Sequence, residues 1–440
     1  MFTVRYMGVV ALALCLLPGA SPTLAQGRAL GLREAVDLAF QQDPWLEGSR
    51  LRQQALNASA VAAGSLPDPM VSVGAASLPT DTFDFNQEAM TQFKVGVTQT
   101  LPRGDSLALG RQRLEVMGEQ QAHLQADRRE QLAVAVAGRW LDAWRAGESI
   151  RLIESDRSLF ENLAEVTENS YANAAGRTRQ QDVIRAQLEL TRLDDRVTSL
   201  RQQRDAALGQ LGEWLGAGYG VGGDLPSLTL RAAQQIRGQA EVDPTWLGRV
   251  LSAHPAVTGL EQTITASDID VELARQQYRP QWGLNASYGY RDDAPNGMER
   301  ADLFSFGVSF DLPLFTGKRQ DPQLRAATAQ AQASRTDKAL ALRRLRAGFE
   351  AERAQLARLE ERDTLYSKRL LQQMHDQSEA ALSAYTHDEG DFAEAMRARI
   401  DDLNARVDAL GIRVELQRAI IRLNYYLAGL GQVPGEKVQP

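Results

Sequence analysis

The sequence predicts a mixed α/β membrane protein in which short amphipathic strands are joined to very long helices. Three observations indicate this fold class: two pairs of strand-like segments, two long stretches without proline, and a repeat of the whole arrangement within the chain. The strands carry the membrane prediction. Hydrocarbon offers no partner for unpaired backbone groups, so a chain without an apolar run of about 18 residues can span a bilayer only as a closed barrel.

The clearest strand signal lies in residues 282–313. Two arms, 282–290 and 304–312, each alternate between apolar residues and small polar residues, and a polar loop joins them. A strict period of two predicts an extended strand with one apolar and one polar face. Taken alone, this hairpin fits a soluble antiparallel sheet better than a membrane barrel. In a barrel, the residues expected to face lipid are Trp282, Tyr288, Tyr290, Phe304, Phe306 and Phe310.

The first 25 residues predict a cleaved export signal. Arg5 supplies the positive charge, residues 9–17 form an apolar run too short to span a bilayer, and cleavage is expected after Ala25. Cys15 follows Leu14, where a lipoprotein signal would have a small residue, so acylation is not expected. Cleavage would leave no cysteine, and hence neither disulfides nor thiolate metal sites.

Proline placement predicts where the long helices lie. No proline occurs between Pro102 and Pro226, or between Pro322 and Pro434, and an interior proline costs a helix about 3 kcal/mol or more. Apolar residues recur at three-four spacing through both gaps. An uninterrupted helix from about 322 to 385 would be roughly 95 Å long at 1.5 Å per residue, so we expect the helices to pair as coiled coils.

The chain is an internal duplication. Residues 93–97 and 101–102 match residues 304–308 and 312–313 at one offset, and the same offset relates Asp43-Pro44 to His254-Pro255. Repeats of this length should share a fold. The predicted division is a signal at 1–25, a first repeat at 26–242, a second repeat at 243–433 and a tail at 434–440. The first repeat has strands at about 70–77 and 93–101, helices at about 105–215 and an irregular connection at 216–242; the second has strands at about 282–290 and 304–312 and helices at about 321–430.

The two helix-reversing turns also correspond. Each contains a tyrosine and a glycine that ends the first helix, and glycine supplies the left-handed conformation that reverses the chain. After a two-residue shift, each turn is followed by a carboxylate and, three residues later, an arginine. The matched pairs are Tyr171 and Tyr385, Gly176 and Gly390, Asp182 and Glu394, and Arg185 and Arg397.

Together these features resemble the TolC-like outer-membrane efflux protein family over essentially the whole mature chain. The motifs that carry the resemblance are LREAVDLAFQQDP (32–44), the strand endings QTLP (99–102) and FDLP (310–313), and the turns followed by DVIRA (182–186) and DFAEAMRA (391–398). The resemblance implies a homotrimer with four strands per chain in a twelve-stranded outer-membrane β-barrel. A long α-helical coiled-coil tunnel would continue the barrel through the periplasm.

The resemblance also implies partners and a functional end. Family members dock on a periplasmic adaptor (membrane fusion protein) and an inner-membrane RND-type transporter, and serve as their exit duct. Carboxylates after the second turn narrow the tunnel there. The corresponding constriction candidates are Asp182, Arg185, Glu394, Arg397, Tyr171 and Tyr385. The adaptor-docking candidates at the turns are Gly176, Arg177, Asp388, Gly390 and Asp391. The two arginines depart from the family pattern, which has a second aspartate there, and this puts a selective gate in doubt; the alternative is a solvated charge near a turn.

Catalytic and cofactor chemistry is not expected. The sequence lacks a nucleophile elbow, a phosphate loop and an HExxH motif. His387 lies beside acidic residues, but a polar turn is the better interpretation than a metal site. An exported chain with a net charge of −7 gives no indication of nucleic-acid binding.

The transported substrate is the least determined expectation. The loop at 78–93 resembles that of family members paired with heavy-metal exporters, which favours a metal-cation system over drug or type I protein secretion. A different class, a soluble periplasmic coiled-coil scaffold or adaptor, would also explain the helices. An adaptor, however, needs lipoyl-like and β-barrel domains, for which the chain has no room between its helices.

Overall fold

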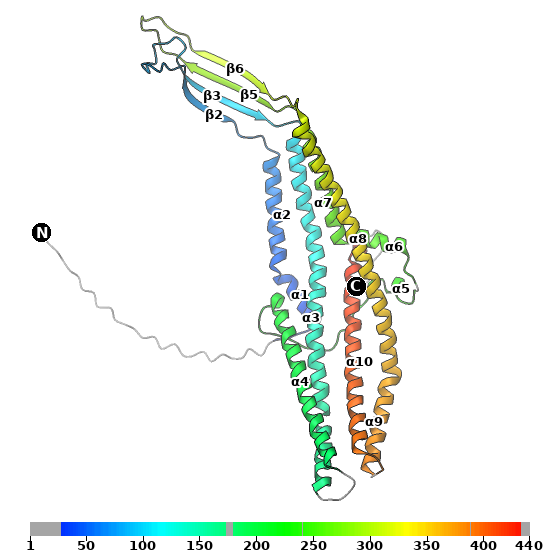
Figure 1. Ribbon diagram of the computed structural model, residues 1–440. Coiled ribbons are helices and arrows are strands. Elements are labelled where there is room, and N and C mark those ends of the chain that lie inside the picture. Colours follow the sequence, from blue (N-terminus) through cyan, green and yellow to red (C-terminus); the bar gives the residue numbers. More distant parts are fainter. Residues whose placement is uncertain (1–27, 173–178, 240, 388, 433–440) are drawn as a thin grey trace, which may run out of the picture.

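The computed structural model describes residues 28–172, 179–239, 241–387 and 389–432, which form a long helical rod with a β-sheet at one end (Figure 1). The elements are β1 (Arg28–Leu30), α1 (Leu32–Gln42), α2 (Pro44–Ala63), β2 (Met70–Ala76), β3 (Gln92–Leu101), α3 (Ser106–Ala172), α4 (Gln180–Leu215), β4 (Tyr219–Val221), α5 (Ala233–Ile236), α6 (Pro244–Ser252), α7 (Pro255–Gln276), β5 (Trp282–Tyr290), β6 (Leu303–Phe310), α8 (Gln320–Leu365), α9 (Leu371–Thr386) and α10 (Phe392–Tyr426). Short 3-10 turns at Thr316–Lys318 and Ala428–Gln432 and a π-helical turn at Tyr366–Leu370 complete the set.

The two hairpins combine into one antiparallel sheet of order β2-β3-β5-β6. One row of opposed residues runs Val73, Val95, Tyr288, Phe304 across all four strands. Because directly opposed residues point to the same side of a sheet, the apolar positions of both repeats share one face. The predicted mixed α/β fold is therefore confirmed, with the hairpin of each repeat joined to the other through β3 and β5.

Four strand boundaries differ slightly from the prediction, one of them the start of β6, which lies at Leu303 and not at residue 304. The last strand was expected to reach residue 312, but β6 ends at Phe310. The Asp311 carboxylate accepts hydrogen bonds from the Arg103 guanidinium and, at 2.7 Å, from the Gln281 amide, and Pro313 has no N–H to pair. β2 ends before Ser77, whose φ of 56° lies outside the strand region. β3 begins one residue earlier than expected, at Gln92.

The long helices pair along their lengths. α3 has 67 residues, so it extends about 100 Å, and it packs along α4. α10 packs against α8, α9 and α3, while α2 and α7 lie along the part of α3 that is nearer the sheet (Figure 1). None of the helices in the described ranges combines the length and apolar character of a membrane-spanning helix.

One uninterrupted α-helix was expected for residues 322–385, but this second long helix is not uniformly α-helical. A π-helical turn at Tyr366–Leu370 separates α8 from α9, although the helix continues through it. Such a turn carries one residue more than an α-turn. The apolar residues Leu359, Tyr366 and Leu370 keep three-four spacing through this turn, so the sequence pattern does not reveal it.

Three helices begin at an Asp-Pro or His-Pro pair. Asp43, Asp243 and His254 each accept a hydrogen bond from the backbone amide two residues later, at 3.2, 2.9 and 3.2 Å. The following proline occupies the first helical position, where its missing N–H costs nothing and its fixed φ suits the helix. These pairs start α2, α6 and α7.

A short parallel pair at mid-rod was not predicted. β1 at residues 28–30 pairs with β4 at residues 219–221. β4 lies within the segment 216–242, which was expected to be an irregular connection. Trp140 of α3 lies beneath it, 1% exposed, and its Nε1 donates to the Leu30 carbonyl at 2.9 Å. Three-residue strands carry no periodicity, so their pairing arises only from the packed core around Trp140.

Candidate functional site

The carboxylates after the two turns occupy equivalent helix positions. α4 begins at Gln180 and α10 at Phe392, which makes Asp182 and Glu394 the third residue of each helix. Both helices start at the end of the rod away from the sheet (Figure 1). The two-residue shift in the sequence match therefore corresponds to the same turn of helix in both repeats.

The two carboxylates nevertheless have different surroundings. Asp182 is 5% exposed, and its Oδ2 accepts a hydrogen bond from the Arg179 amide at 2.9 Å, which caps the start of α4. Glu394 is exposed, and its side chain makes no hydrogen bond or ion pair to any described residue; only its amide bonds, to the Asp391 carbonyl at 3.1 Å. Of the two constriction candidates, Glu394 is thus the one whose carboxylate has no partner in the described part of the chain.

The other constriction candidates also divide into free and engaged groups. Arg185 and Arg397 are exposed and have no ion-pair partner among the described residues, so this end of the chain carries unpaired charges of both signs. Tyr171 is 48% exposed. Tyr385 packs edge-on against Phe392, with ring centroids 5.7 Å apart, and so holds the end of α9 against α10.

Part of the predicted docking tip is described. The reversal requires glycine at position 390, but not for the left-handed conformation that was expected, because Gly390 has no left-handed φ. Its amide donates to the Ala384 carbonyl at 2.9 Å, and a Cβ there would lie 2.9 Å from the Tyr385 amide nitrogen, so the close approach of the backbone is the reason. Asp391 is exposed at the start of α10. Gly176, Arg177 and Asp388 lie outside the described residues.

Metal binding finds no support in the described part of the chain. His387 uses its Nδ1 for a hydrogen bond to the Ser383 carbonyl at 2.8 Å. The described residues contain no group of three potential metal ligands.

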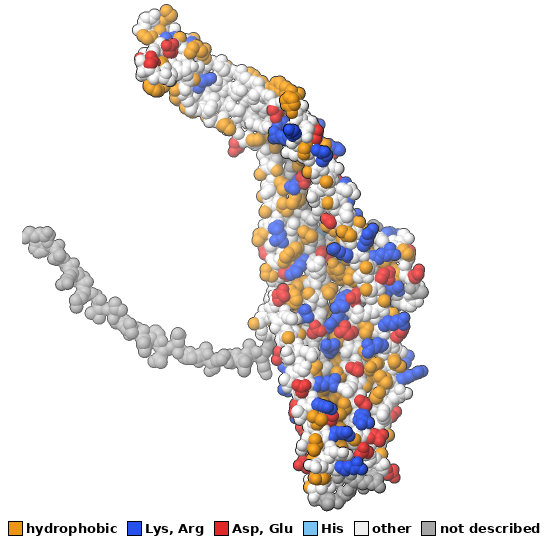
Figure 2. Space-filling view, viewed as in Figure 1, with side chains coloured by type: hydrophobic (Ala, Val, Ile, Leu, Met, Phe, Trp, Pro, Cys, Tyr) orange, Lys and Arg blue, Asp and Glu red, His pale blue; other side chains and the backbone are white. Residues whose placement is uncertain are grey.

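The aromatic face of the sheet is exposed. Phe304 and Phe306 are 73% and 67% exposed, and Trp282 packs beside Phe310 with ring centroids 4.8 Å apart. Charged side chains are scattered along the helical rod but are sparse on the sheet between its ends (Figure 2). Exposed apolar faces of this size mark an interaction surface. Contact of this face with lipid stays a prediction.

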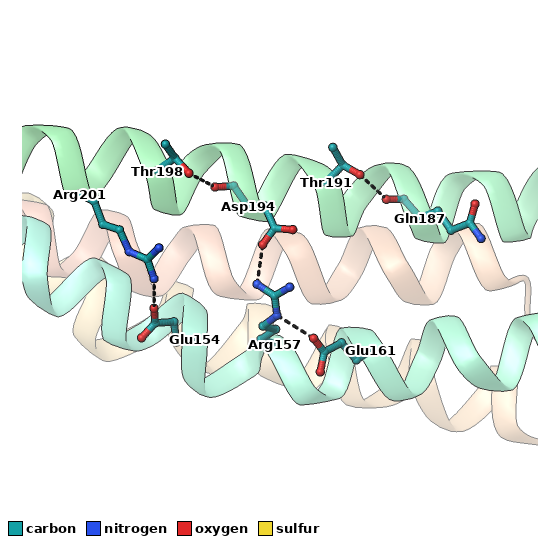
Figure 3. A network of polar contacts seen from close by, with 8 residues as sticks. All are labelled: Glu154, Arg157, Glu161, Gln187, Thr191, Asp194, Thr198 and Arg201. Carbon is teal, nitrogen blue, oxygen red and sulfur yellow. Dashed lines mark hydrogen bonds and ion pairs between the residues drawn. The ribbon is translucent and has the colours of Figure 1, made fainter.

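Ion pairs along the rod follow two patterns. Between α3 and α4 they are exposed: Arg157 pairs with Asp194, and Arg201 lies 2.9 Å from Glu154, while Arg157 also pairs with Glu161 within α3 (Figure 3). Such pairs contribute less than about 1 kcal/mol each.

The pairs between α3 and α10 are less exposed. Arg406 binds Asp156, whose side chain is 15% exposed, and lies 3.1 Å from Asp402; Arg418 binds Asp142. These contacts join the two helix pairs of the chain. The pairs of Arg406 with Asp156 and of Arg418 with Asp142 could not be predicted, because their partners are more than 200 residues apart in the sequence.

A buried polar cluster at mid-rod was also missed. His254 is fully buried, with Nδ1 accepting from the Ala256 amide and Nε2 donating to the Tyr425 carbonyl at 3.0 Å. The Tyr425 hydroxyl donates to Asp127 at 3.3 Å, and Gln131 donates to the same carboxylate at 2.6 Å. Burial lowers the pKa of His254 and raises the pKa of Asp127, since it disfavours the charged form of each.

His254 should make the fold sensitive to acid. Because its folded pKa lies below the ordinary value near 6.5, the native state favours the neutral ring, and stability is lost as the pH falls below about 6.5. We expect His254→Asn, which retains a capping side chain, to lose less unfolding free energy between pH 7.5 and 5.5 than the unaltered chain. Thermal unfolding at both pH values measures this.

Asp127 works in the opposite direction, because its raised pKa favours the protonated form in the native state and so adds stability as the pH falls. Comparing the variant with the unaltered chain at each pH cancels that contribution. An equal acid-induced loss in both proteins would show that His254 is not the sensitive group.

Known proteins share this fold. No protein-family model matches the sequence. The alkaline protease secretion protein AprF of Pseudomonas aeruginosa is 24% identical over 268 residues, which is 60% of this chain and 50% of that protein; the match spans half the length of this relative. Its name and those of the structures below describe channels, membrane proteins or secretion proteins, not enzymes.

Three solved structures are similar over nearly the whole chain. Structures of CusC, whose description reports transmembrane channel formation, give a TM-score of 0.72 at 15% identity and cover 94% of this chain and 95% of theirs. The CmeC outer membrane channel of Campylobacter jejuni gives 0.74 at 13% identity, covering 90% and 85%. The outer membrane protein VceC of Vibrio cholerae gives 0.73 at 15% identity, covering 90% and 96%. The chain therefore has the fold of the TolC-like outer-membrane channels, as the sequence motifs predicted.

Proposed function

We propose that the chain is the outer-membrane exit duct of a tripartite efflux system and acts as a homotrimer. The observation that carries the proposal is the four-stranded sheet, with its exposed aromatic face, mounted on paired helices about 100 Å long. A sheet of this kind suits a bilayer, and helices of this length suit the aqueous space beneath it. The fold shared with outer-membrane channels supports the same assignment.

Assembly follows from the open edges of the sheet. Within the chain, β2 and β6 each pair on one side only, and four strands cannot close a barrel when small barrels need about eight. Pairing β6 of one copy with β2 of the next removes both edges. Three copies give the twelve strands that the family resemblance implies.

The proposed partners are a periplasmic adaptor and an inner-membrane RND-type transporter. They would engage the helix turns at the end of the rod that lies away from the sheet. The described groups available there are the exposed residues Arg185, Asp391, Glu394 and Arg397 and the partly buried Gly390. An export signal at residues 1–25 would deliver the chain to the periplasm and outer membrane.

Membrane fractionation tests the duct against the soluble scaffold. We expect the full-length protein, expressed in a Gram-negative host, to require detergent for extraction and to show the native mass of three chains. A monomer in the soluble periplasmic fraction would overturn the duct.

Glu394 is the proposed constriction carboxylate. In planar-bilayer recordings of the trimer, Glu394→Ala should raise the conductance. The substitution removes an exposed side chain, without a partner in the described chain, that would narrow the proposed constriction. Asp182→Ala should mainly lower stability, by about 0.5 to 2 kcal/mol, because it removes a helix cap. Unchanged conductance in Glu394→Ala would remove this residue from the constriction.

Heavy-metal cations are the proposed substrate, on the resemblance of the loop at 78–93 to that of metal-exporting systems. Secretion of a protein is the second candidate, favoured by the name of the relative AprF. Deleting the gene should lower tolerance to copper, silver or zinc if metals are the substrate. Unaltered tolerance to all three would leave drug or protein export.

A further inference from the structure

One charged side chain lies on the small polar face of the sheet. Opposed residues place Ser72, Gly96, Ser287 and Ser305 on that face, and Lys94 shares it. All four strands of this sheet lie in the described ranges, and every other residue on this face is uncharged. In the proposed trimer, three copies of Lys94 would therefore stand in an otherwise uncharged lumen.

The neighbours of Lys94 leave its charge unopposed. It pairs with Gly74 on one side and with Gly289 on the other, and neither has a side chain that could shield the ammonium group. The Lys94 side chain makes no ion pair or hydrogen bond to any described residue, although its backbone belongs to the sheet. A carboxylate on a neighbouring strand would stabilise a lysine in a sheet. The cross-strand neighbours of Lys94 are glycines, so its charge receives no such stabilisation.

We infer that Lys94 gives the barrel lumen a preference for anions, and this inference rests on the proposed function. Rings of lysine or arginine select anions in pores because the cations raise the local potential in the aqueous path. The screening length is about 10 Å at 0.1 M salt and about 30 Å at 0.01 M. The three charges therefore act across the lumen at low ionic strength and are screened at high ionic strength.

The loops at the same end of the sheet carry charges of the opposite sign. Residues 77–91 carry three acidic side chains and no basic one, and residues 291–302 carry four acidic and two basic side chains, so both loops have a net negative charge. One of the two arginines, Arg300, donates to the Asn86 and Glu88 carbonyls at 3.2 Å. These groups lie beyond the strand ends and set a background that does not change when Lys94 is replaced. The contribution of Lys94 to ion selectivity is therefore measured as the difference between the unaltered protein and its Lys94 variants.

The substrate class follows from this charge. Anionic or neutral solutes would pass the ring of Lys94 more readily than free hydrated metal cations. A metal exported through this barrel would pass most easily as a neutral or anionic complex.

Zero-current potentials across planar bilayers test the inference. The purified full-length protein would be inserted into a bilayer that separates 0.1 M from 0.01 M KCl. The variants Lys94→Gln, Lys94→Glu and Lys94→Arg would be measured in the same way. We expect Lys94→Gln to lower the anion-to-cation permeability ratio by about threefold, and Lys94→Glu to lower it further. Lys94→Arg should match the unaltered protein, and all differences should shrink when the gradient is set near 1 M KCl.

Lys338→Gln is the matched control, since it removes a lysine from α8 that pairs with Glu261 at 2.6 Å, outside the sheet. A channel-forming Lys94→Glu protein with an unchanged zero-current potential would overturn the role of Lys94. Failure of the unaltered protein to form channels would instead overturn the proposed function, and this inference with it.

Discussion

Phe306→Arg is expected to abolish trimer assembly in the outer membrane, whereas Ser305→Arg leaves assembly intact and lowers conductance. Phe306 lies in a row with Ala286, Val97 and Val71 on the exposed apolar face, while Ser305 opposes Ser287 on the small polar face. A cation on the lipid side at mid-bilayer costs roughly 2 to 4 kcal/mol per chain. Extraction with detergent followed by native mass measurement shows assembly, and bilayer recording shows conductance.

The comparison is matched because the two residues are neighbours on one strand and receive the same side chain. Phe306→Leu, which keeps the lipid side apolar, should assemble normally. If both arginine variants assembled equally well, then either the assignment of the two faces or the membrane location would be wrong.

Trp140→Ala is expected to lower the free energy of unfolding by about 3 to 5 kcal/mol. Trp140 is 1% exposed in the core at mid-rod, where α1, α3, α4 and the β1–β4 pair meet. Truncation would leave a cavity and remove one of the two hydrogen bonds that the Leu30 carbonyl accepts, the other coming from the Gly222 amide at 3.2 Å, and both losses destabilise the fold. Denaturant unfolding of the detergent-solubilised protein measures the loss.

Trp144→Ala is the control for this variant. Trp144 stacks on Trp140 with ring centroids 6.4 Å apart, but it is partly exposed and donates to the Gly223 carbonyl in a surface loop. Its truncation should cost clearly less. Equal losses would mean that the core around Trp140 does not hold the mid-rod together.

The helices and hairpins could be predicted because their signals are local. Alternation over nine residues in Trp282–Tyr290 indicates a strand, and long helices are possible only in the proline-free stretches, where apolar residues recur at three-four spacing. The duplication then predicted the weaker hairpin at β2 and β3 from the stronger one. Elements without local periodicity, such as β1, β4 and the π-helical turn, could not be found in this way.

The candidate site was predicted only in outline. Matching the turns identified Asp182 and Glu394 as equivalent, and the structure places both at the third position of their helices. The sequence could not indicate that the Asp182 carboxylate accepts a hydrogen bond from the Arg179 amide, whereas the Glu394 carboxylate has no partner among the described residues. That difference depends on how each turn enters its helix.

By itself the sequence determined the pattern of strands and helices, their duplication and the two chemically distinct faces of each hairpin, because these properties depend on neighbours along the chain. Tertiary structure alone decided that β3 pairs with β5, that Arg406 meets Asp156 and that Lys94 lies between two glycines. Each of these contacts joins residues brought together by packing, and neither strand period nor helix period specifies the partner across such a distance. The exposed hairpin face thus follows from local alternation, and its continuity across four strands follows from the fold.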